Sequence, residues 1–362
     1  MLVGVLEDAS AVDELRQDHL IAEAINLGRI FEDPWATNNF WFCLDLHRRA
    51  NFLNGEASIV ECARWELAIG RGLNHYWSAV QLEQPKGDLA LDDFAAEAFR
   101  NIGSLLEATT QPLLRELLGQ LRLIRGKTTE SIAQLDFGVV VSELESTSGV
   151  DDLFAPKPWG VSLSQWRNIA QHHSFEVEGE VVKVRYGKGD RAREIDLSRE
   201  GLWNLLRLIF RIQLLIKTAR TIFVLDHRGS FRDQAKAVEE RPDALVFGFA
   251  TIMASQGFEV IILEVKSERA RAVVRDVTEM PPYIRQFHAS QLVQNLWAAT
   301  GAAECELEYQ QRDGTPTLVT IAAATDCDAV GKGLIDPGEF GRRVTFRQLA
   351  ICTPPNNLEE RL

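Results

Sequence analysis

The chain has 362 residues, enough for about two or three domains at roughly 150 residues each. Hydrophobic residues make up 46% and charged residues 25%, an ordinary globular composition that permits a full apolar core. The net charge of −13 argues against a general polyanion binder, because repulsion would slow the approach to nucleic acid. It does not exclude a local basic site.

The cysteines show no CxxC pair and no histidine at ligand spacing; they are Cys43, Cys62, Cys305, Cys327 and Cys352. This pattern indicates reduced thiols, with neither a disulfide framework nor a zinc site. The N-terminus lacks a basic segment, so no signal peptide is expected. The most apolar stretch, 202–225, is interrupted by four basic residues and is a poor membrane span. We therefore expect a soluble cytoplasmic protein without membrane contact, metal or cofactor.

Residues 1 to about 125 carry apolar side chains at helical spacing, with breaks at Asp33-Pro34, Asn54-Gly55 and 85–87. A cluster of aromatic residues near the first break is interpreted as helix packing in preference to base stacking. It comprises Trp35, Phe40, Trp41 and Phe42. A further helix is predicted from Thr128 or Thr129 to about Glu145.

A short helix starts at a clear capping signal. In Ser162-Leu163-Ser164-Gln165 the Ser hydroxyl and the Gln side chain can satisfy the first free amides, the pattern of a capping box. The helix that follows ends in Arg167-Asn168-Ile169-Ala170-Gln171-His172, with His173 directly after it.

After the histidine pair the apolar period changes from helical to alternating. Three short strands are predicted, over 175–178, 181–186 and 192–195. Ser198 then caps a long amphipathic helix that ends near Leu225. The charged segment Asp226–Arg241 is the best candidate for a domain boundary.

The remainder repeats one order of elements, a helix followed by two strands. The helices are predicted over 243–256 and 283–299, and the strands over 258–265, 270–277, 304–310 and 317–323. This order predicts a small α+β domain with an antiparallel sheet. The predicted domains are an N-terminal helical region (1–90), a helical domain with the Arg/His run (91–227) and a C-terminal α+β accessory domain (240–362).

Arg167, Asn168 and His172 bring together a fixed positive charge, an amide and an imidazole. Such groups can hold a phosphodiester, offset its transition-state charge and transfer protons near neutral pH. In a regular helix Arg167 and His172 lie about 140° apart around the axis. A long Arg side chain, a frayed helix end or a symmetric dimer would each bring them together. The alternative is a surface salt bridge at Arg167 and a polar helix end at the histidines.

Basic residues crowd the segment after the histidine pair, where only Asp190 opposes them before Glu194. They are Lys183, Arg185, Lys188, Arg191 and Arg193. We interpret them either as the solvated face of a hairpin or as an RNA-binding edge beside the Arg/His helix.

The run Arg167, Asn168, three more residues and His172 resembles the Arg-x4-6-His motif of the HEPN superfamily, in which a polar residue, often Asn, follows the Arg. The surrounding layout is similar too: helices before the motif, a hairpin bearing Tyr186-Gly187 and a closing amphipathic helix. The resemblance covers roughly residues 95–225. It implies a mainly α fold, a HEPN-like helical bundle with a β-hairpin insertion. His173 also satisfies the motif, as an alternative register.

Catalytic members of that superfamily are metal-independent ribonucleases that act as dimers, commonly as toxins or as abortive-infection and phage-defence effectors. The resemblance implies that His172 is the general base or acid, that Arg167 holds the scissile phosphate, and that Asn168 orients one of them. The product would be a 2′,3′-cyclic phosphate. The expected partners are RNA, with tRNA as one candidate, a second copy of the chain, and a trigger or inhibitor at the C-terminal domain. The alternative is a non-catalytic HEPN-fold dimer that binds a nucleotide or protein partner.

Overall fold

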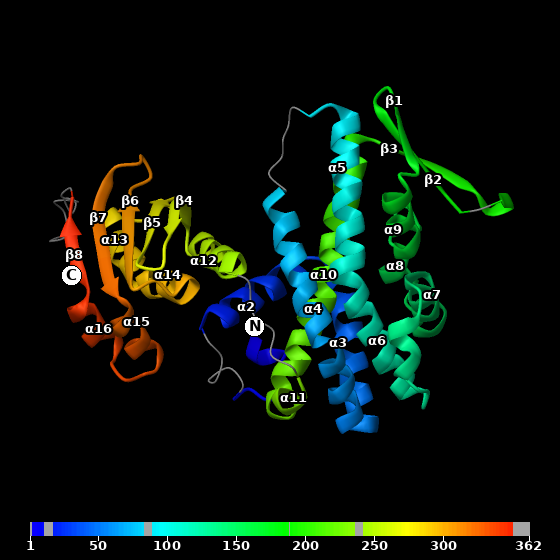
Figure 1. Cartoon of the computed structure of the whole chain (residues 1–362), viewed down its shortest axis with the longest axis horizontal. Helices are drawn as coiled ribbons and strands as arrows, with labels where there is room; N and C mark the ends of the chain where they lie inside the picture. The colour runs from blue at the N-terminus through cyan, green and yellow to red at the C-terminus, as the bar shows by residue number, and fades with distance from the viewer. Residues whose placement is uncertain (1, 11–16, 83–88, 188, 236–241, 350–362) are drawn as a thin grey trace. The chain divides into compact units, whose positions relative to one another are not determined.

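The computed structural model describes residues 2–10, 17–82, 89–187, 189–235 and 242–349 (Figure 1). They form two compact units, one mainly from Glu23–Glu239 and the other mainly from the residues after Glu239. The division falls within the charged segment expected as a boundary. The described parts of 1–90 and 91–227 share the first unit, except residues 17–22, which group with the second. Among the described residues, no helix is both long enough and apolar enough to cross a membrane.

The first unit is mostly helical. Its helices are η1 (Leu2–Gly4), α2 (Gln17–Phe31), α3 (Pro34–Asn54), α4 (Glu56–Leu82), α5 (Leu91–Ser104), η2 (Leu105–Thr110), α6 (Gln111–Ile124), η3 (Glu130–Gln134), α7 (Phe137–Ser148), α8 (Asp151–Phe154), α9 (Leu163–His172), η4 (Gly189–Arg191), α10 (Arg199–Asp226) and α11 (Arg228–Gln234). α3, α4, α6 and α10 pack against one another around the apolar core (Figure 1).

The predicted breaks at Asp33-Pro34 and Asn54-Gly55 and the predicted start of the helix after Ser198 are confirmed, whereas the break at 85–87 lies outside the described residues. Each confirmed boundary has a local cause. Asp33 accepts a hydrogen bond from the Trp35 amide at 2.9 Å, and Pro34 occupies the first turn of α3. The same helix ends where Gly55 takes a φ of +47°. The Ser198 hydroxyl caps α10 by accepting from the Gly201 amide at 3.0 Å.

The aromatic cluster packs between helices, as predicted. Phe40 is fully buried, its ring centroid 5.3 Å from that of Trp41 and 5.7 Å from that of Phe31. The helix expected from Thr128 is instead two elements. η3 ends at Gln134, the next residue, Leu135, is extended, and Asp136 then precedes α7.

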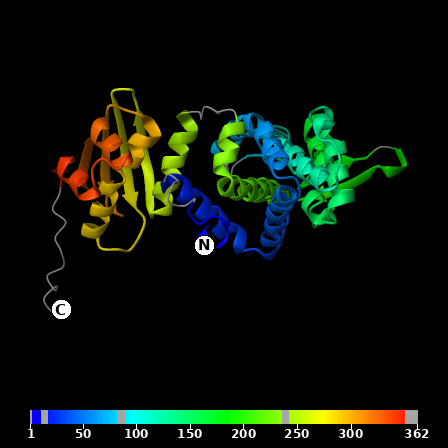
Figure 2. The ribbon, with the colours of Figure 1, turned by 90° about the horizontal axis from the view of Figure 1, so that it is seen from below.

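A three-stranded antiparallel sheet follows α9 and confirms the predicted hairpin. Its strands are β1 (Phe175–Glu178), β2 (Val181–Tyr186) and β3 (Arg193–Leu197), in the order β1-β2-β3. Val182 and Val184 are buried on one face of β2, next to α9. The far end of the sheet projects beyond the helices (Figures 1 and 2).

The second unit contains a five-stranded sheet in the order β4-β5-β6-β7-β8. Its elements are α12 (Pro242–Ser255), β4 (Phe258–Val265), β5 (Arg269–Asp276), α13 (Pro282–Gln291), α14 (Val293–Thr300), β6 (Glu304–Gln310), β7 (Pro316–Ala323), α15 (Ala324–Gly331), α16 (Pro337–Arg343) and β8 (Thr345–Gln348). The four predicted strands are confirmed within a residue at each end, whereas α15, α16 and β8 were not predicted.

The expectation of an antiparallel sheet is wrong, because β5 and β6 run parallel and the sheet is mixed. The connection between them holds α13 and α14, and a helical crossover returns the chain to the end of the sheet where β5 began. The single helix expected over 283–299 is divided at Leu292, where ψ is 0°.

One face of this sheet carries the core of the second unit. Ala272, Leu307 and Tyr309 pack there against residues of α12, α13 and α14, including Phe249 and Leu296. The opposite face carries an ion-pair ladder, in which residues of β5 pair with residues of β6. Its members are Arg269, Arg271, Glu304, Glu306 and Glu308.

Candidate functional site

The short helix α9 has three faces with different environments. It begins as predicted, because the Ser162 hydroxyl accepts a hydrogen bond from the Gln165 amide at 3.4 Å. The apolar face is buried in the first unit and consists of Leu163, Trp166, Ile169 and Ala170. A second face, with Asn168 and His172, borders a groove. A third face carries Arg167 and Gln171, which contact η2.

The groove lies between α9, α7 and the end of β2 and has a volume of about 1080 Å³. Asn168 and His172 line it from α9, one helical turn apart, and Arg185 and Tyr186 line it from β2. Several small and polar residues complete its walls, among them Ser142, Ser146, Ser162, Gln165 and Ser174. An imidazole, an amide, a guanidinium and a phenol therefore share one accessible surface.

The helix separates Arg167 from His172, in line with the angle calculated from their spacing. Arg167 does not line the groove. Its Nη2 lies 3.2 Å from Glu107 Oε1, and its Nη1 donates to Asn168 Oδ1 at 3.3 Å. Gln171 Nε2 donates to the other oxygen of Glu107. Arg167 is therefore linked to the groove indirectly, through its hydrogen bond to Asn168.

The two histidines occupy different environments. His172 is the last residue of α9, is exposed and lines the groove. His173 takes the left-handed backbone conformation that ends the helix, with a φ of 49°, and its amide donates to the Ile169 carbonyl. Its ring lies 6.1 Å from that of Phe175 and outside the groove. Of these two histidines, His172 is therefore the one that lines the groove.

The basic hairpin is largely neutralised by acidic neighbours. Lys183 Nζ lies 2.5 Å from Glu178, and hydrogen bonding to that carboxylate raises the Lys183 pKa. Arg185 Nε lies 2.7 Å from Glu194, which raises the Arg185 pKa and lowers that of Glu194.

Among the predicted RNA-binding residues whose side chains the structure describes, which are Lys183, Arg185 and Arg193, Arg185 alone lines the groove. Arg193 donates to the carbonyls of Asp190 and Ala192 at the turn. Lys188 lies outside the described residues, and Arg191 belongs to η4.

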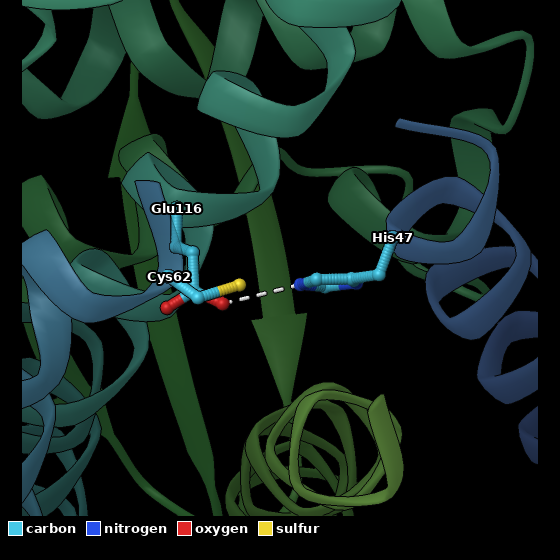
Figure 3. Close-up of side chains that lie close together, drawn as sticks. All are labelled: His47, Cys62 and Glu116. Atoms are coloured by element: carbon cyan, nitrogen blue, oxygen red, sulfur yellow. Dashed lines mark hydrogen bonds and ion pairs between the residues drawn. The ribbon is translucent and has the colours of Figure 1, made fainter. Parts of the chain in front are cut away.

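A second polar cluster, which sequence spacing did not reveal, lies in the core of the first unit. His47, Cys62 and Glu116 come from α3, α4 and α6, and their potential ligand atoms lie within 4.8 Å of one another (Figure 3). His47 Nε2 lies 3.1 Å from Glu116 Oε1, and Nδ1 lies 2.8 Å from the Cys43 carbonyl oxygen.

This cluster is best explained as a polar network of the core. Arg220 Nε donates to Glu116 Oε2 at 2.8 Å and supplies the positive charge that a metal would otherwise bring. Burial, reinforced by Glu116, raises the Cys62 pKa well above its ordinary value, which disfavours the thiolate that binds metals. Gln120 Nε2 lies 3.2 Å from the Cys62 sulfur.

Glu107 is the site residue that the sequence analysis missed. It lies 60 residues before Arg167 in a helical run with no unusual composition, so only the fold brings the two together. Among family models, curated proteins and solved structures, no match to this chain was found.

Proposed function

We propose that the α9 groove is the active site of an endoribonuclease of HEPN type. The observation that carries this proposal is that His172, Asn168 and Arg185 line one open groove. The imidazole would transfer protons, the amide would donate to a phosphate oxygen, and the guanidinium would attract the phosphodiester. Tyr186, at the same wall, offers a ring on which a base can stack.

The proposed reaction needs no group beyond side chains and RNA. The ribose 2′-oxygen attacks the neighbouring phosphorus, and its proton passes to a base. The bond from phosphorus to the 5′-oxygen breaks, and that oxygen receives a proton from an acid. The products are a 2′,3′-cyclic phosphate and a 5′-hydroxyl end. No metal-assisted step is part of this proposal.

Two proton transfers per cleavage favour a dimeric site. Among the described residues that line the groove, His172 is the only histidine, and one imidazole supplies either the base or the acid at a given moment. A second copy of the chain, related by a two-fold axis, would bring a second His172 to the same phosphate. In this arrangement Asn168 and Arg167 of each copy would flank the site.

The test is cleavage of total cellular RNA by the purified protein in EDTA. We expect wild-type cleavage with cyclic phosphate ends, a loss of about a hundredfold or more in His172→Ala, and retention in His173→Ala. Cleavage that survives His172→Ala would refute the assignment. Equilibrium sedimentation of the same samples checks that an inactive variant remains a dimer.

The second candidate is a non-catalytic module of the same fold that binds a nucleotide or protein partner. The ion pair between Arg167 and Glu107 favours it, because Glu107 offsets the charge that would hold a phosphate. Growth of a host that expresses the chain distinguishes the two. A toxic nuclease of the kind used in phage defence slows growth, and His172→Ala relieves this effect. If the chain is a binding module, the wild type and His172→Ala should have the same effect on growth.

A further inference from the structure

Glu107 lies in η2, between α5 and α6. α5, η2 and α6 are consecutive, and η2 is a π-helical turn between two α-helices. Such turns recur at functional sites, because they change the direction of the side chains that follow. Leu105, Leu106, Thr109 and Thr110 of η2 are buried, whereas Glu107 is exposed. The turn therefore buries one side in the core and presents one carboxylate at the surface.

A close backbone contact with α4 holds this turn in place. A Cβ atom added to Gly72 would lie 2.2 Å from the carbonyl oxygen of Ala108 and 3.0 Å from the Cα of Thr109. Only glycine allows α4 to approach the turn this closely. The backbone next to Glu107 consequently has no room to move toward α4.

Glu107 contacts α9 at two points. Arg167 and Gln171 lie one turn apart on the same face of α9, and each donates to a different oxygen of the Glu107 carboxylate. The side chains of Arg167 and Glu107 are 26% and 45% exposed. At such exposure an ion pair adds about 1 kcal/mol or less to the free energy of unfolding. Glu107 contributes little to stability, so an effect of its removal on catalysis would have a different origin.

The contact continues from Arg167 to the groove. A guanidinium group only donates hydrogen bonds, so the Asn168 atom that faces Arg167 Nη1 at 3.3 Å is the amide oxygen. Both N–H groups of the Asn168 amide are then left for the groove. In the opposite orientation the amide would present an oxygen, which repels a phosphate.

We infer that Glu107 is a positioning residue, which acts through Arg167 to direct the amide N–H groups of Asn168 into the groove. This inference rests on the proposed nuclease function for its effect on catalysis, but not for the orientation of the amide. It assigns a role to Arg167 within each chain, in addition to any contact with phosphate across a dimer.

The first test is a double-mutant comparison of cleavage rates. We expect Glu107→Ala to lower kcat by about tenfold to a hundredfold with little change in KM, because the amide loses its orientation. Glu107→Gln keeps an oxygen that accepts from Arg167, so its kcat should lie between those of the wild type and Glu107→Ala. In an Asn168→Ala background, Glu107→Ala should cause no further loss. Losses that multiply would refute the inference.

The matched control is Glu339→Ala in α16. It removes a carboxylate of similar exposure, 38%, from an ion pair with Arg343 in the other unit. Its kcat and melting temperature should equal those of the wild type.

The second test does not depend on cleavage. The side-chain amide resonances of Asn168, assigned by their absence in Asn168→Ala, should shift in Glu107→Ala and stay in place in Glu339→Ala. Unchanged resonances in Glu107→Ala would refute the inference, even in an active enzyme. If the wild type cleaves no RNA, the nuclease proposal fails, and this spectrum alone decides the orientation of the amide.

Discussion

Replacement of Arg220 by methionine tests the buried network around Glu116. Arg220 is 7% exposed and contacts Glu116 at 2.8 Å, Glu66 at 2.5 Å and the Cys62 carbonyl at 3.3 Å. Methionine has a similar apolar stem but leaves the Glu116 carboxylate buried without its main counter-charge. Removal of one partner from a buried ion pair costs about 3–5 kcal/mol. We expect Arg220→Met to lower the free energy of unfolding by this amount at neutral pH.

The matched control is Arg211→Met on the same helix. The Arg211 side chain is 44% exposed and pairs with Asp33 at the surface. Such pairs contribute about 1 kcal/mol or less, so this variant should be close to the wild type. Urea unfolding followed by tryptophan fluorescence is a suitable assay, because all eight tryptophans except Trp297 precede residue 240. Equal losses in the two variants would refute the reasoning.

The pH dependence provides a second check with a definite sign. Burial by itself would raise the Glu116 pKa, but Arg220 and His47 hold it below its ordinary value. Ionised Glu116 therefore stabilises the wild type above the unfolded-state pKa of about 4.3, and this stability is lost as pH falls through the folded pKa. Without Arg220, burial dominates and the Glu116 pKa rises. The variant should then lose stability as pH rises above about 4.3, so the difference from the wild type should widen toward neutral pH.

The remaining predictions concern backbone positions and a thiol. Gly119→Ala places a Cβ 2.5 Å from Glu61 Oε1, so it should lower the free energy of unfolding by about 1–3 kcal/mol. The Cβ of Gly138→Ala has no atom within 4 Å, so this variant should raise the free energy of unfolding by up to about 1 kcal/mol. Equal effects of the two variants in urea unfolding would contradict this reasoning. His173 has a positive φ, which glycine adopts at a lower cost in free energy. His173→Gly should therefore raise the melting temperature and leave any RNA cleavage activity unchanged. Burial raises the Cys305 pKa to about 11, so mass spectrometry should find Cys305 unmodified by iodoacetamide at about pH 8 unless the protein is unfolded.

Local signals in the sequence predicted the elements well. The Ser162 and Ser198 caps start α9 and α10 where expected, and the alternating pattern after His173 forms the three-stranded sheet. These features depend on side chains within a few residues of the backbone groups they satisfy. The mixed order of the second sheet was missed, because strand direction depends on a crossover and not on the residues of β5 or β6.

Contacts between distant residues explain most of what the sequence could not predict about the site. The 140° separation of Arg167 and His172 followed from helix geometry, but the presence of Glu107 beside Arg167 did not. Glu107 belongs to a π-helical turn that Gly72, from another helix, approaches closely. The buried cluster of His47, Cys62 and Glu116 likewise combines residues from three helices with no shared motif.

The junction between β3 and α10 has a mechanical consequence. β3 ends at Leu197 and α10 begins at Arg199, so Ser198 alone separates them, and its side chain is bonded to the first turn of the helix. The single linking residue and its hydrogen bond restrict the movement of β3 relative to α10. We therefore expect a molecule that binds the far end of the projecting sheet to transmit force to α10, the helix that carries Arg220.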